Sequence, residues 1–157
     1  MKSIKISILG ADGYTCQIPR IKEGMKNLGH ILSEESPSLI YANDPTGYNK
    51  AMTLKKKFPS SYLILNFLDV PWHFPNIDKQ TKLLVEQFLT KADAVTVISF
   101  KVKKDLDKFL NKKIEVIYNP IKDVFHDKDI KKDNTFLYVG RANDPIKRIN
   151  LVKESLL

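Results

Sequence analysis

One candidate ligand site follows the first apolar segment of the chain. The apolar run at residues 4–9 ends in Gly10, Ala11, Asp12, Gly13 and Tyr14. If residues 4–9 form a strand of a parallel sheet, this turn lies where such sheets bind ligands, outside the carboxyl end of a strand. The turn does not match a dinucleotide-binding glycine motif or a P-loop. A turn with positive φ would also select glycine, so a purely conformational role stays open.

A second candidate site is basic and lies near the end of the sequence. Arg141 follows an apolar run at residues 135–139, and Lys147 falls in the first turn of the helix expected after it. Both cations would then lie near a helix N-terminus, where backbone N–H groups already attract anions. This spacing suits a diphosphate clamp, in which the arginine binds with both arms of its guanidinium group. The alternative is that both are solvated residues of a basic protein.

Other acidic, histidine and cysteine residues lack the setting that their chemistry needs. Asp127 and Asp129 form a D-x-D pattern, but within a lysine-rich segment instead of after an apolar strand. Asp105 and Asp107 would point to different faces of a helix. The histidines show no metal-ligand spacing, and Cys16, the only cysteine, has no evident base partner. We therefore expect no metal, no internal disulfide and no two-carboxylate glycosidase site.

The elements that would position these residues alternate between strand and helix. Apolar, β-branched runs predict strands at residues 4–9, 38–42, 62–68, 94–98, 114–118 and 135–139, with a short strand at 31–33. Helical spacing predicts inward faces formed by Ile21, Met25 and Leu28; by Ala51, Leu54 and Phe58; by Leu84, Val85, Phe88, Leu89 and Ala92; by Val102, Leu106 and Phe109; and by Ile149, Val152 and Leu156. Pro19, Asp44 and Ser99 are placed at or near helix starts, with Asp44 and Ser99 as caps, and Gly29 ends the first helix.

This alternation predicts an α/β fold with a doubly wound, parallel, Rossmann-like sheet. Residues 1–121 would form that domain. Residues 122–134 contain four lysines and four aspartates with few apolar residues, which is typical of a charged linker. Residues 135–157 would then be the first strand and helix of a second Rossmann-like unit that is incomplete in this chain.

Composition limits the function classes. The chain has 157 residues, of which 43% are hydrophobic and 28% charged, as expected for a globular protein. No apolar run reaches the roughly 18 residues of a membrane span, and the lone cysteine favours a reducing, cytoplasmic location. The net charge of +8 favours an anionic partner such as phosphate or an anionic membrane surface. Because lysine greatly outnumbers arginine, specific nucleic-acid binding is disfavoured.

Three segments, taken in order, resemble a known enzyme family. Residues 28–30 resemble the "GH" end of that family's first helix. Residues 92–99 and 114–121 resemble its "aDaviavS … i.vIpNgvd" pattern, and residues 136–156 resemble "vGR….KG…li.A". The family is the GT-B-fold glycosyltransferases grouped in glycosyltransferase family 4.

The resemblance implies two Rossmann-like domains, of which the first receives the acceptor and the second binds a nucleotide-sugar donor. Transfer would retain anomeric configuration and need no metal or other cofactor. Arg141 and Lys147 would hold the donor diphosphate. Gly10, Asp12, Gly13, Tyr14, Asp69 and His73 would line the acceptor side. The acceptor would be a sugar or lipid-linked molecule, and an anionic membrane would be a peripheral contact.

The sequence departs from the family pattern at informative places. Leu68 occupies the position of a histidine often found in the family, although His73 is nearby; Arg148 replaces a glycine, and Pro120 replaces another. The E-x₇-E segment that grips the donor is not in these residues. We therefore expect the 157-residue chain alone to show no sugar transfer.

The alternatives to an enzyme are a non-catalytic sugar- or phosphate-binding module that needs a partner and, less favoured, a basic nucleic-acid-binding domain. The apolar stripe of the final helix predicts docking or dimerisation.

Overall fold

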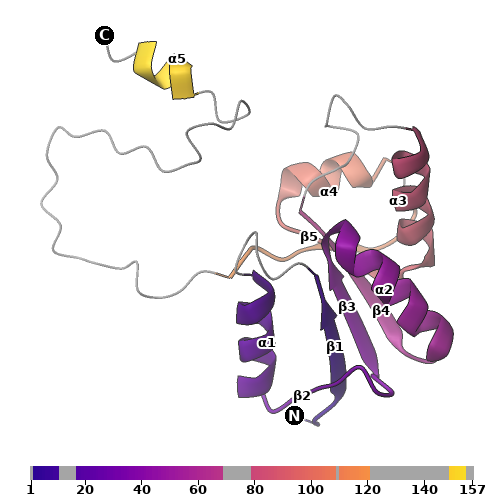
Figure 1. Cartoon of the computed structure of the whole chain (residues 1–157). Coiled ribbons are helices and arrows are strands. Elements are labelled where there is room, and N and C mark those ends of the chain that lie inside the picture. Colours follow the sequence, from indigo (N-terminus) through magenta and orange to yellow (C-terminus); the bar gives the residue numbers. More distant parts are fainter. Residues whose placement is uncertain (1, 11–16, 69–78, 109, 121–148, 155–157) are drawn as a thin grey trace, which may run out of the picture. The chain divides into compact units, whose positions relative to one another are not determined.

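The computed structural model of the chain describes residues 2–10, 17–68, 79–108, 110–120 and 149–154 (Figure 1). Contacts divide the chain into two compact units, Met1–Ile121 and Lys122–Leu157. In the second unit the described element is α5 (Ile149–Glu154), which falls within the predicted last helix. The predicted linker at 122–134 and the predicted strand at 135–139 lie outside the described residues.

The first unit is built on a six-stranded, all-parallel sheet. Its strands run in the order β2-β1-β3-β4-β5-β6 and are β1 (Lys5–Leu9), β2 (Ile31–Leu32), β3 (Leu39–Asn43), β4 (Tyr62–Phe67), β5 (Ala94–Val97) and β6 (Ile114–Val116). The register places Asn43 beside Asn66 and Asn66 beside Thr96. The predicted α/β, Rossmann-like parallel sheet is therefore confirmed. The chain order of the strands reverses at β1, and ligands of doubly wound sheets bind near such a reversal.

In the described segments of this unit, the strands are connected by α1 (Gln17–Asn27), α2 (Asp44–Lys57), α3 (Lys79–Lys91) and α4 (Phe100–Leu106). Gly29 adopts φ +82 and ends α1 as predicted, with the His30 amide donating back to the Met25 carbonyl. Ser99 caps α4 as predicted, because its Oγ accepts from the Val102 amide at 3.2 Å. In the described part of the chain, no helix is long and apolar enough to cross a membrane.

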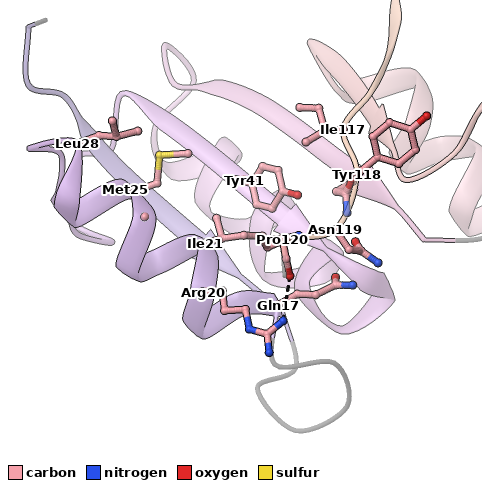
Figure 2. A pocket seen from close by; sticks show the side chains of 12 residues that line it. Gln17, Arg20, Ile21, Met25, Leu28, Tyr41, Ile117, Tyr118, Asn119 and Pro120 are labelled. Atoms are coloured by element: carbon pink, nitrogen blue, oxygen red, sulfur yellow. Dashed lines mark hydrogen bonds between the residues drawn. The ribbon is translucent and has the colours of Figure 1, made fainter. Parts of the chain in front are cut away.

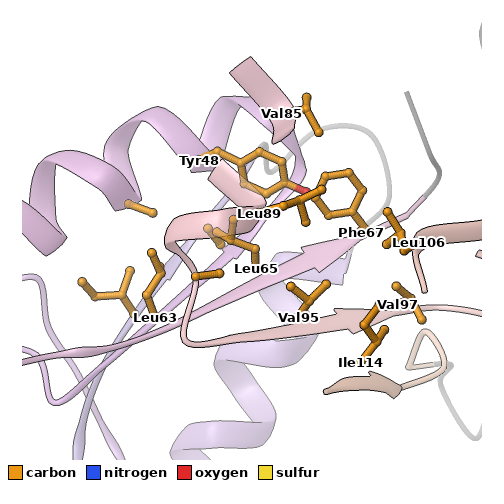
Figure 3. Packing of buried hydrophobic residues seen from close by; sticks show 14 of the residues in the cluster. Tyr48, Leu63, Leu65, Phe67, Val85, Leu89, Val95, Val97, Leu106 and Ile114 are labelled. Atoms are coloured by element: carbon orange, nitrogen blue, oxygen red, sulfur yellow. The ribbon is translucent and has the colours of Figure 1, made fainter. Parts of the chain in front are cut away.

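The two faces of the sheet bury separate apolar clusters. The larger cluster lies under α2, α3 and α4 and includes Tyr48, Leu65 and Val95 (Figure 3). Strands buried this way are nearly continuous apolar runs in the sequence, as residues 62–68 are. The smaller cluster lies between β1 and α1 and consists of Ile6, Ile8 and Ile18 with half-buried neighbours. Among the described helices, α1 packs against this smaller cluster, whereas α2, α3 and α4 cover the larger one. A pocket opens beside α1.

Ionic contacts fix the edge of the sheet where the strands begin. The Asp93 carboxylate accepts from the Leu63 amide at 2.7 Å and from Lys55 Nζ at 2.9 Å. Burial alone would raise the pKa of Asp93, but these donors outweigh it and hold the pKa below its ordinary value. Lys112 Nζ donates to the carbonyls of Leu89, Thr90 and Ala92 at the end of α3. A cation there also complements the helix dipole.

Three predictions about these elements need correction. Asn43, and not Asp44, is the N-cap position of α2, and it makes no side-chain capping bond; its Oδ1 accepts from Asn66 Nδ2 instead. Leu84 is exposed, since α3 turns Val85, Leu89 and Ala92 inward instead. Strand β6 ends at Val116, two residues earlier than predicted, and the chain beyond it leaves the sheet to form a pocket wall.

Candidate functional site

A hollow of the first unit, here called the α1–β6 pocket, lies between α1 and residues 117–120, which follow β6 (Figure 2). Its volume is about 290 Å³. It is lined by Gln17, Arg20, Ile21, Gly24, Met25, Leu28, Tyr41, Asn66, Ile117, Tyr118, Asn119 and Pro120. The Arg20 guanidinium donates to the Pro120 carbonyl at 2.9 Å and so joins the two walls. The size is at the lower end of the range for small-molecule sites.

A chain of buried amides runs along the carboxyl ends of the strands to this pocket. The Thr96 hydroxyl donates to Asn66 Oδ1 at 2.8 Å, and Asn66 Nδ2 donates to Asn43 Oδ1 at 2.5 Å. Asn43 Nδ2 then donates to Gln17 Oε1 at 3.3 Å. We call these four residues the amide relay. Every bond in it runs in the same direction, and such chains polarise each other.

The relay ends on a free donor at the pocket wall. Because Gln17 Oε1 accepts from Asn43, its Nε2 group is left to face another acceptor. Gln17 is only 6% exposed, and among the described residues its side chain makes no other hydrogen bond. A buried amide that offers two N–H donors to a pocket gains free energy from a ligand oxygen placed there.

Tyr41 lies on the pocket floor beside the relay. Burial raises its pKa from 10.0 to about 12, and a hydrogen bond with Thr96 partly offsets this effect. The Tyr41 side chain is therefore a neutral phenol at physiological pH. It offers the pocket an aromatic surface with a polar tip.

The raised pKa of Tyr41 predicts a pH effect. Because the folded pKa lies above the unfolded value, the Tyr41 contribution to stability is complete below about pH 10 and is lost as the pH rises through about 12. Phenolate absorbance after a rapid pH jump should include a step near pH 12, and Tyr41→Phe should reduce that step by one tyrosine. Tyr62→Phe is the control and should keep it. If Tyr41→Phe also keeps it, the assignment to Tyr41 is wrong.

Among the sequence-predicted site residues, Gly10 is the one that the structure describes. A Cβ atom added there would lie 2.6 Å from the Asn43 carbonyl oxygen and 2.9 Å from Ile18 Cδ1. The end of β1 thus packs directly against the start of α2, which supports the conformational role of this glycine. The other predicted residues lie outside the described ranges, namely Asp12, Gly13, Tyr14, Asp69, His73, Arg141 and Lys147. Their roles stay predictions.

Sequence reasoning missed the residues that form the pocket. Helical spacing predicts that Ile21, Met25 and Leu28 face the core; Ile21 and Met25 do pack against the smaller cluster, but all three also line the pocket, and Leu28 is 59% exposed. Asn66 carried a usable signal, because a carboxamide inside an apolar strand needs a buried partner. Gln17 carried none, since its role depends on strands that lie far away in the sequence.

The described residues contain no group of three or more histidine, cysteine or acidic side chains that could hold a metal ion. Comparison of the chain with models of protein families finds no match, and neither do searches of curated proteins and of solved structures.

Proposed function

We propose that the chain supplies the acceptor-side domain of a retaining GT-B glycosyltransferase, which transfers a sugar from a nucleotide-sugar to a sugar or lipid-linked acceptor. The observation that carries this proposal is the α1–β6 pocket, which joins aromatic and aliphatic walls to the free amide of the relay. The ordered motifs of the sequence and the Rossmann-like sheet support the same assignment.

The chemistry of the pocket suits a glycosylated acceptor. A sugar ring has an apolar face of C–H groups and a rim of hydroxyls. Tyr41 and Tyr118 provide flat apolar surfaces, while Gln17 and Asn119 provide amide groups that bind hydroxyls. The aliphatic residues of α1 extend the pocket, so that a lipid or other aglycone can lie beside the sugar.

The donor half of the reaction belongs to other residues. In this proposal Arg141 and Lys147 bind the diphosphate of the nucleotide-sugar and neutralise it as it departs. The donor is a substrate, and the proposal requires no resident cofactor. Acceptor binding by Met1–Ile121 is separate from donor binding, so the two can be measured separately.

The acceptor proposal predicts that Tyr118→Ala weakens binding of alkyl glycosides about tenfold, because an aromatic contact of about 1.4 kcal/mol is lost. Tyr62→Ala is the matched control. Tyr118 and Tyr62 are 65% and 50% exposed, but only Tyr118 is among the residues that line the pocket. Binding would be measured by saturation-transfer NMR on the 157-residue chain.

The same samples test the donor and the alternative function. Nucleotide-sugars should give signals that the double variant Arg141→Gln/Lys147→Gln loses, while its glycoside signals persist. Glycoside binding without any nucleotide-sugar binding would contradict the diphosphate contacts of Arg141 and Lys147 in this chain and leave the acceptor pocket standing, as in a sugar-binding module. Equal loss in Tyr118→Ala and Tyr62→Ala, or no glycoside binding at all, would contradict the acceptor pocket.

A further inference from the structure

The α1–β6 pocket has one polar end, and that end offers mainly donors. Figure 2 shows the side chains of Gln17 and Asn119 on the same side of the pocket as the Arg20 guanidinium. Gln17 presents Nε2, because its oxygen is held by the relay. Arg20 carries no acceptor atoms at all. A ligand group at this end must therefore supply acceptor oxygens.

Arg20 also brings a positive charge that no acidic side chain of the described segments pairs with. Its one hydrogen bond goes to a neutral carbonyl, that of Pro120, and within the described ranges it forms no ion pair. No Asp or Glu is among the residues that line the pocket. The contact with Pro120 uses one terminal nitrogen, so the rest of the guanidinium fork can still bind an oxyanion.

The other end of the pocket is apolar. Ile21, Met25 and Leu28 follow one face of α1 away from Gln17, and Ile117 lies across from them (Figure 2). Ile21 and Met25 are half-buried and pack against the smaller core cluster, Leu28 and Ile117 are exposed, and all four line the pocket. Covering them with a ligand's hydrocarbon would remove apolar surface from water, which favours binding.

Together these ends define a ligand class, and we propose that the acceptor bound in the α1–β6 pocket is an amphipathic anion. Its oxyanion contacts the Arg20 guanidinium and Gln17 Nε2, and its apolar chain lies along Ile21, Met25 and Leu28. This inference rests on the proposed acceptor function and narrows it from glycosides in general to anionic amphiphiles. A single chain suits the pocket, given its volume of about 290 Å³.

The test compares three probes on the full chain by isothermal titration, below their micelle concentrations: decyl phosphate, decyl glucoside and inorganic phosphate. Decyl phosphate should bind about tenfold more tightly than either of the others, since it alone uses both ends of the pocket. A charge-assisted hydrogen bond of about 1.5–3 kcal/mol corresponds to at least tenfold in affinity. Arg20→Gln should therefore weaken decyl phosphate about tenfold or more.

Lys26→Gln is the matched control, because it removes the same charge from an exposed position of α1 outside the pocket. It should leave the affinity within about twofold. Gln17→Glu is a second test, since its carboxylate can still accept from Asn43 but repels an anion. It should weaken decyl phosphate more than decyl glucoside. Circular dichroism would confirm that each variant is folded.

The outcomes separate this inference from the proposed function. Equal affinity for decyl phosphate and decyl glucoside would overturn the anionic acceptor but leave the acceptor pocket standing. Equal effects of Arg20→Gln and Lys26→Gln would also overturn it, because they would place the anion outside the pocket. Failure of every amphiphile to bind would overturn both the inference and the acceptor pocket.

Discussion

Replacing Asn66 with leucine should lower the free energy of unfolding of the first unit by about 2–5 kcal/mol. Asn66 is 4% exposed and holds the centre of the amide relay. Without its carboxamide, Asn43 Oδ1 would lose its donor, and the buried Thr96 hydroxyl would lose its acceptor and keep only its hydrogen bond with Tyr41. Each such group costs about 1–3 kcal/mol. Urea denaturation followed by circular dichroism would measure the change.

Two further variants make this prediction specific to the relay. Asn49→Leu makes the same exchange at an exposed position of α2 and should change stability by less than about 0.5 kcal/mol. Adding Thr96→Val to Asn66→Leu removes one of the stranded groups, so the double variant should be less destabilised than the sum of the two single variants. If the two changes in the free energy of unfolding simply add, the Asn66 and Thr96 side chains do not interact, which would contradict the relay.

Gly10→Ala should destabilise the same unit by about 3 kcal/mol. The added Cβ would lie 2.6 Å from the Asn43 carbonyl oxygen, and Gly10 has φ +156, which side chains rarely adopt. Overpacking costs about 1–3 kcal/mol, and backbone strain costs a similar amount. The side chain of Ile18 can move away, but the carbonyl is fixed at the junction of β3 and α2. The midpoint of urea unfolding would report the loss.

Gly24→Ala in the nearby helix α1 should instead raise the free energy of unfolding. An added Cβ there meets no atom within 4 Å, and Gly24 lies inside α1. Alanine favours a helix over glycine by about 1 kcal/mol, so this variant should be more stable than the parent. A Gly10→Ala protein as stable as the parent would show that β1 and α2 can separate without cost.

The sheet could be predicted from the sequence because its strands are buried on both faces. Residues 62–67 and 94–97 carry mostly apolar side chains on both faces of the sheet, so the sequence predicts buried strands there. Caps were predicted where a side chain acts on its own backbone, as Ser99 does. Asn43 was missed as the N-cap because its side chain serves a neighbouring strand instead of its own helix.

The candidate site was far less predictable because it depends on long-range geometry. Gln17, Asn43, Asn66 and Thr96 are brought together by the register of three strands, and no local pattern encodes that register. The apolar stripe of α1 has the same spacing whether it faces a core or a ligand. Periodicity therefore identified the helix but could not tell these two roles apart.

The contact between Arg20 and Pro120 also bears on how the chain folds. These residues are 100 positions apart in the sequence, whereas β3, α2 and β4 are consecutive elements. Closing short loops is entropically cheaper, so we expect the β3–α2–β4 segment to form early and the pocket to close last. The ability to bind a ligand would then appear only in the final kinetic phase of refolding, after most of the helical signal has returned.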